Sequence, residues 1–134
     1  MPKLPWTNVE AAAPDSEVVV MASRLPLRSY RHIPGFLAAT LRIRRQLARS
    51  PGLVGYALDA KLLRKEFWTL SVWADRAALG RFDRADPHKG SVEGIRPHME
   101  PSTFVFWTTT AADVPIGWDE AVRRVEERRA TTGS

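Results

Sequence analysis

The stretch EFWTLSVW, residues 66–73, decides the fold class of this chain. Its residues alternate between two faces, as those of a β-strand do, and most of them are aromatic or β-branched. One face carries Trp68, Leu70 and Val72, and the other carries Phe67, Thr69, Ser71 and Trp73. Large apolar side chains on both faces predict a strand inside a sheet that is covered on both sides.

Three further strands surround this one in the sequence. Residues 17–24 and 53–60 are rich in Val, Ala and Leu, and residues 103–110 alternate aromatic with smaller residues. Residues 34–49 change to a helical period, with Pro34 in the first turn and arginines away from the apolar stripe. Asp75 is a predicted N-cap of a second helix, which residues 86–88 interrupt before another helical stretch at 88–99.

The predicted order is β-α-β-β-α-β, followed by a charged helix at residues 118–130. This order is the split arrangement of an α+β, ferredoxin-like domain with an antiparallel sheet. We assign residues 16–112 to that domain, residues 1–15 to an extended leader, and residues 113–134 to the terminal helix and tail. Aromatic side chains on both faces of the sheet favour a homodimer, in which two sheets cover each other.

Composition excludes several classes of protein. The chain has 134 residues, a formal charge of +5 and no cysteine, so disulfides, thiolate nucleophiles and Cys-ligated metals are absent. No apolar run approaches the ~20 residues of a membrane helix, and a cytoplasmic location is the default. The basic charge does not come with the aromatic-interleaved pattern of a nucleic-acid binder, so we expect Arg42, Arg44, Arg45 and Arg49 on a solvated helix face.

Residues 66–73, together with Ala77, Ala78, Leu79, Phe82 and the Pro87-His88 pair, carry a family resemblance. From about residue 18 to 107 the chain resembles the dimeric α+β barrel superfamily, which includes antibiotic-biosynthesis monooxygenases and spheroidene-monooxygenase-like proteins. The resemblance implies a homodimer with a pocket between sheet and helices in each subunit. Members of this superfamily include cofactor-free oxygenases of polycyclic phenols, haem degraders and haem-bound enzymes.

The three histidines are the first candidates for chemistry. His88 is the expected general base or haem ligand, with Asp86 orienting it and Arg96 or Arg24 stabilising an anionic oxygen. His98 is a weaker candidate, and His32 is expected to face solvent. None of the three has the i,i+3 or i,i+4 partner of a helix-borne metal site, so no metal is expected.

Aromatic residues are the expected walls of the substrate pocket. Trp68 and Phe82 could pack against a flat ring, and Tyr56 could donate a hydrogen bond to a carbonyl. The odd spacing of Trp68 and Trp73 places them on opposite faces of the strand, so at most one of the two lines the pocket.

The leading interpretation is a monooxygenase-like oxidoreductase that acts on a small hydrophobic or aromatic molecule. No nucleotide cofactor is expected, because no Gly-rich phosphate loop is present. The leading interpretation needs no other cofactor, and a haem-binding enzyme of the same fold is the alternative. A non-catalytic ligand-binding or dimerisation module is a second alternative. No nucleic-acid and no membrane partner is expected.

Overall fold

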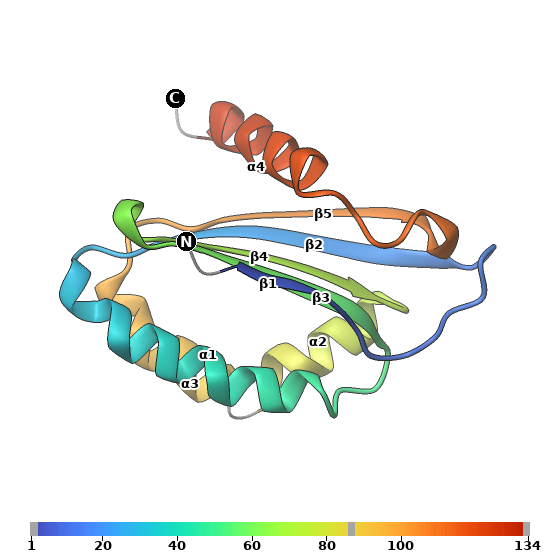
Figure 1. Cartoon of the computed structure of the whole chain (residues 1–134), viewed down its shortest axis with the longest axis horizontal. Helices are drawn as coiled ribbons and strands as arrows, with labels where there is room; N and C mark the ends of the chain where they lie inside the picture. The colour runs from blue at the N-terminus through green and yellow to red at the C-terminus, as the bar shows by residue number, and fades with distance from the viewer. Residues whose placement is uncertain (1–2, 86–87, 133–134) are drawn as a thin grey trace.

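A computed structural model describes residues 3–85 and 88–132 of the chain. Its centre is a five-stranded antiparallel sheet in the order β1-β3-β4-β2-β5 (Figure 1). The strands are β1 (Lys3–Asn8), β2 (Glu17–Pro26), β3 (Leu53–Lys61), β4 (Glu66–Trp73) and β5 (Thr103–Thr110). The helices are α1 (Ile33–Leu47), α2 (Arg76–Arg84), α3 (His88–Ile95) and α4 (Trp118–Thr132), and short 3-10 turns occur at Tyr30–His32, Leu62–Arg64, Arg96–His98 and Ala111–Asp113.

The predicted α+β, ferredoxin-like order is confirmed. Strands β4 and β5 have the bounds that their alternation predicts, and Pro34 lies in the first turn of α1. The Asp75 side chain accepts a hydrogen bond from the backbone N–H of Ala78 at 2.8 Å, so it caps α2 as expected.

Residues 1–15 were expected to form an extended leader with little structure of its own, and residues 3–8 of this segment form β1. This strand pairs antiparallel with β3 and becomes an edge of the sheet. Trp6 of β1 lies against Gly55 of β3, where a Cβ atom would stand 2.4 Å from the indole ring. Glycine at position 55 is therefore what lets β1 and its tryptophan approach the sheet.

The two faces of the sheet are covered by different helices. Figure 1 shows α1, α2 and α3 on one side of the sheet and α4 on the other. The side of α1, α2 and α3, called the three-helix face below, holds two apolar clusters. The first contains Trp73, Leu79 and Phe82, and the second contains Phe36 and Phe67.

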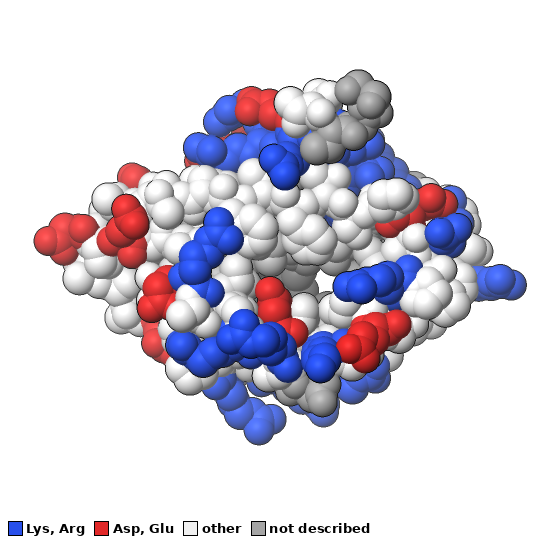
Figure 2. All heavy atoms as spheres, turned by 180° about the vertical axis from the view of Figure 1, so that it is seen from behind, with Lys and Arg blue, Asp and Glu red and all other residues white. Residues whose placement is uncertain are grey.

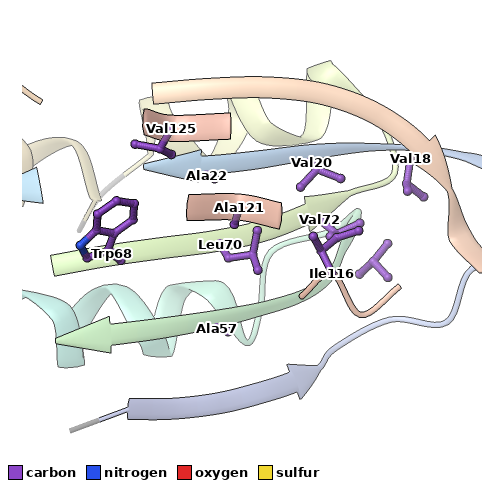
Figure 3. Close-up of a cluster of buried hydrophobic side chains, with 11 residues drawn as sticks. Val18, Val20, Ala22, Ala57, Trp68, Leu70, Val72, Ile116, Ala121 and Val125 are labelled. Atoms are coloured by element: carbon purple, nitrogen blue, oxygen red, sulfur yellow. The ribbon is translucent and has the colours of Figure 1, made fainter. Parts of the chain in front are cut away.

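The opposite side, called the α4 face below, is a continuous apolar core. Figure 3 shows its side chains from β2, β3, β4 and α4 directed toward one another. They include Val18, Val20, Ala22, Ala57, Trp68, Leu70, Val72, Ile116, Ala121 and Val125. Ala121 and Val125 of α4 are fully buried, so this helix covers a surface for which we expected a second copy of the chain. The homodimer stays a prediction, because the structure describes one chain.

Candidate functional site

A row of hydroxyl groups lies on the three-helix face of the central strands. Ser23 of β2 is paired in register with Thr69 of β4, and their hydroxyl groups share a hydrogen bond. Two residues further along β4, on the same face, Ser71 accepts a hydrogen bond from the Trp73 indole N–H at 2.8 Å. Ser23 and Ser71 are buried polar residues, so this face is chemically unlike the α4 face.

Next to the hydroxyl groups, aromatic side chains of β5 lie on the same face at the edge of the sheet. The register places Phe104 of β5 opposite Ser23, and Phe106 opposite Met21. Paired residues of antiparallel strands share a face, so both phenyl rings stand on the three-helix side. They remain 47% and 38% exposed, respectively, which shows that the helices do not cover this edge. Figure 2, which views the molecule from behind, shows a hollow near the centre, between the sheet and the helices below it.

His88 stands at the start of α3, where contacts with Gln46 and Phe82 position it. Its backbone N–H donates to Oε1 of Gln46 on α1 at 2.8 Å. Its imidazole lies 4.6 Å from the Phe82 ring, between ring centroids, and Phe82 in turn lies 5.3 Å from Trp73. A chain of ring contacts therefore connects His88 with the hydroxyl row through Trp73 and Ser71.

The carboxylate beside His88 belongs to Asp83. Nδ1 of His88 is 3.8 Å from Asp83 Oδ1 and 3.3 Å from the Asp83 carbonyl oxygen. Desolvation raises the pKa of the Asp83 carboxyl, and the neighbouring charges of His88 and Arg84 oppose that rise. A carboxylate next to Nδ1 favours the tautomer that leaves Nε2 free to accept a proton.

The sequence had suggested Asp86 for this orienting role, and Asp86 lies outside the described residues. Asp83 was missed because it belongs to the last turn of α2, where an acidic residue is usually a solvated surface group. The signal that could have found it is the spacing of five residues between Asp83 near the end of α2 and His88 at the start of α3.

Two other expected site residues lie on the three-helix face. Phe82 is buried between His88 and Trp73. Tyr56 is also buried, and its register partner on β4 is Ser71. The Tyr56 hydroxyl accepts a hydrogen bond from Nε of Arg44 at 3.4 Å, so this phenol is oriented by α1.

Trp68 and Arg24 lie on the α4 face, which corrects the expectation that they share a pocket with His88. Arg24 Nη2 donates to Glu66 Oε2 at 2.7 Å, and the Trp68 indole N–H donates to Glu66 Oε1 at 3.1 Å. Burial alone would raise the pKa of Glu66, but the hydrogen bonds from Arg24 and Trp68 hold it below its ordinary value. The tryptophan of β4 on the three-helix face is Trp73.

The remaining candidates lie at an exposed end of the molecule. Arg96 is an exposed residue of the 3-10 turn after α3, and no described contact joins it to His88. His98, in the same turn, stacks on His32 with 4.0 Å between ring centroids. Desolvation, followed by the neighbouring His98 and Arg31, lowers the pKa of His32. His32, which was expected to face solvent, therefore stacks on His98.

Within residues 3–85 and 88–132, no group of three or more His, Cys, Asp or Glu side chains could hold a metal ion. In the same described part of the chain, no helix is long and apolar enough to span a membrane.

Comparison with solved structures identifies proteins of the same fold. No protein-family profile and no curated protein sequence matches the chain. A protein of Nitrosomonas europaea assigned as an antibiotic biosynthesis monooxygenase matches it with a TM-score of 0.64 at 16% identity, over 75% of this chain and 94% of that one. A Caulobacter crescentus protein with the same assignment matches with a TM-score of 0.58 at 19% identity, over 72% and 92% of the two chains.

SnoaB of Streptomyces nogalater, described as a cofactor-independent oxygenase, is a third structural neighbour. It matches with a TM-score of 0.55 at 19% identity, over 76% of this chain and all of the other. These neighbours confirm the fold that the residues of β4 and α2 had suggested. The chain has the ferredoxin-like α+β fold of the antibiotic biosynthesis monooxygenases.

Proposed function

We propose that this protein is a monooxygenase-like oxidoreductase, and that it binds a small aromatic molecule between the three-helix face of the sheet and helices α1 and α3. One observation carries the proposal: a His88–Asp83 pair is linked through Phe82 and Trp73 to a row of buried hydroxyl groups. Apolar rings and a few polar groups around a hollow are typical of small-molecule sites. The cofactor-independent oxygenase among the structural neighbours supports the same class of reaction.

The residues supply a route for activating a phenol without a cofactor. Nε2 of His88 takes the phenolic proton, and Asp83 stabilises the imidazolium that results. The hydroxyl groups of Ser23 and Thr69 donate hydrogen bonds to the oxygen that carries the negative charge. Phe104 and Phe106, at the edge of the sheet, contact the flat ring of the substrate.

The overall reaction balances with molecular oxygen as the oxidant. A phenol with one ring C–H para to its hydroxyl reacts with O2 to give a quinone and water. One oxygen atom becomes the new carbonyl, and the other leaves as water with the ring and phenolic hydrogens. The substrate supplies the four electrons that O2 accepts, so no external reductant is needed.

The test is oxygen consumption with a panel of polycyclic phenols, together with transfer of label from 18O2 into the quinone. We expect His88→Gln to abolish turnover and Asp83→Asn to lower kcat by about tenfold to a hundredfold, with a smaller change in KM. His98→Gln is the matched control, because His98 is an exposed histidine stacked on His32. We expect it to keep wild-type turnover.

Unchanged turnover in His88→Gln, with the fold intact by circular dichroism, would reject the assigned base. A Soret band on addition of haemin that disappears in His88→Gln would instead favour the haem-binding alternative. Absence of turnover and of binding for every phenol in the panel would favour the non-catalytic module.

A further inference from the structure

A second concave site lies between two helices of the three-helix face. A cavity of about 550 Å3 opens between α1, the turn that follows it, and α2. It is lined by Arg42, Arg45, Gln46, Arg49, Ser50, Pro51, Ala78, Arg81, Phe82 and Ala85, and is called the arginine groove below. Its volume is that of a site for one small organic molecule.

Four arginines give the groove a concentrated positive charge. Arg42, Arg45 and Arg49 follow one another at spacings of three and four residues, so they share a face of α1 and its C-terminal extension. Arg81 faces them from α2. Among the described residues, none of the four makes an ion pair, and no acidic side chain lines the groove. Like charges that face each other repel, so a bound anion would lower the free energy of this arrangement.

The sequence led us to expect these α1 arginines on an ordinary solvated face. The end of a helix does favour basic residues, which accounts for some positive charge at the end of α1. The same preference accounts for Arg81, which lies in the last turn of α2. It does not account for Arg42, which precedes the last turn of α1, nor for the concave shape between the two helices. The tertiary structure therefore changes the interpretation of these residues.

The other residues of the groove are held in place. Gly52, with a φ of 87°, brings the turn after α1 so close to α2 that a Cβ at this position would stand 2.5 Å from that of Ala78. The Gln46 amide donates to the carbonyl oxygens of Phe82 and Ala85, which ties α1 to the end of α2. Ala78, Phe82 and Pro51 add apolar surface beside the arginines.

We propose that the arginine groove binds a small organic diphosphate, a molecule with two adjacent phosphate groups and a flat apolar part. Guanidinium groups bind phosphate oxygens in bidentate pairs, and arginines from two walls can hold two phosphates at once. The apolar residues would contact the rest of the molecule. The groove borders the proposed oxygenase site, because Phe82 lines the groove and contacts His88, and Gln46 lines the groove and accepts a hydrogen bond from the His88 backbone N–H.

The test is isothermal titration of the purified protein with ADP and, separately, with inorganic pyrophosphate. We expect ADP to bind with a dissociation constant below about 0.1 mM and pyrophosphate to bind more weakly, with both affinities falling as salt increases. The double variant Arg45→Gln/Arg81→Gln removes one arginine from each wall and should weaken ADP binding at least about tenfold. Both side chains are exposed, so the fold should remain unchanged.

The matched control is Arg123→Gln/Arg129→Gln, which removes the same charge from α4 on the other side of the sheet. We expect it to bind ADP as the wild-type protein does. Equal losses in both double variants would show a general charge effect and overturn the proposal. Failure of ADP and pyrophosphate to bind at millimolar concentration would also overturn it, as would binding of an oligonucleotide without binding of ADP.

Discussion

The two faces of one sheet differ in how they are filled. On the α4 face, valine, leucine and alanine side chains pack directly against Ala121 and Val125, and a hydrogen bond joins the charged Arg24–Glu66 pair. On the three-helix face, hydroxyl groups lie among the aromatic residues, and Phe104 and Phe106 remain exposed. Both faces belong to the same strands, so the alternation of residues assigns each side chain to one environment or the other.

The two faces are therefore expected to differ in how much they contribute to stability and to ligand binding. Apolar surface that is fully buried stabilises the fold, whereas buried hydroxyl groups and exposed aromatic rings contribute little to it. We therefore expect substitutions on the α4 face to change mainly the free energy of unfolding. Substitutions in the hydroxyl row and at Met21, Phe104 and Phe106 should change mainly ligand binding and turnover, whereas the two buried apolar clusters of the three-helix face also stabilise the fold.

The largest effect is expected from Ala121→Asp. It places a carboxylate without a partner in the fully buried contact between α4 and the sheet, which should cost about 4 kcal/mol of the free energy of unfolding. Ala130→Asp is the matched control on the same helix, because Ala130 is exposed, and it should cost less than about 1 kcal/mol. Urea unfolding measures both. Equal effects would contradict the packing of α4 on the sheet and would favour the second copy that the sequence predicted.

A comparison of Leu70→Ala with Met21→Ala tests the two faces on neighbouring strands. Leu70 is 1% exposed on the α4 face, so its truncation should lower the free energy of unfolding by about 3 kcal/mol. Met21 is half-buried on the three-helix face, and Met21→Ala should lower it by about 1 kcal/mol. We expect Met21→Ala to change substrate affinity and Leu70→Ala to leave it unchanged. The reverse order of stability losses would contradict the assignment of the two faces.

Glu66→Gln should lower the free energy of unfolding by about 2 kcal/mol near neutral pH, because Arg24 loses its charged partner. The pKa of Glu66 is lower in the folded than in the unfolded chain, so the unfolded chain binds more protons as the solution is acidified. This contribution is complete above the unfolded pKa of about 4.3 and is lost as the pH falls through the folded value. Between neutral pH and about pH 3, the free energy of unfolding should therefore decrease less for the variant than for the wild-type protein. Urea unfolding at a series of pH values measures it.

Glu126→Gln is the control for that experiment. Glu126 forms an exposed ion pair with Arg129, which should be worth less than about 0.5 kcal/mol. The same acid dependence in the wild-type protein and in Glu66→Gln would show that the Arg24–Glu66 pair contributes nothing to it.

The smallest effect is expected at the stacked histidines. The pKa of His32 is lower in the folded chain, so its contribution to stability is present above the unfolded pKa of about 6.5 and falls as the pH drops below it. His98→Gln removes a neighbouring positive charge, and the melting temperature of this variant should therefore decrease less between about pH 7.5 and pH 5.5. An unchanged decrease would contradict the effect of His98 on His32.

Local pattern predicted most of the fold. The alternation of residues 66–73 and 103–110 defined β4 and β5 because period two is set by the strand itself. The missed strand, β1, has the sequence KLPWTN, which contains a proline and little alternation. The position of β1 depends on its pairing with β3 and on the space that Gly55 leaves for Trp6. A local sequence pattern predicts neither of these.

The candidate site was predicted less completely. The candidates His88 and Phe82 are in contact, and Tyr56 shares their side of the sheet. The sequence analysis missed Asp83 as a carboxylate beside His88, and Trp68, expected in the pocket, lies on the α4 face. A single residue of shift moves a strand side chain to the other side, so the choice between Trp68 and Trp73 needed knowledge of which helices cover which face.

The sequence by itself determined the elements, their order and the two-sided character of β4, because those properties follow from the periods of strand and helix. The tertiary structure decided that α4 covers one face, that Asp83 stands beside His88, and that Arg81 faces the arginines of α1. The spacing of these residues in the sequence does not by itself predict that they meet. Only the packing of the helices on the sheet brings them together.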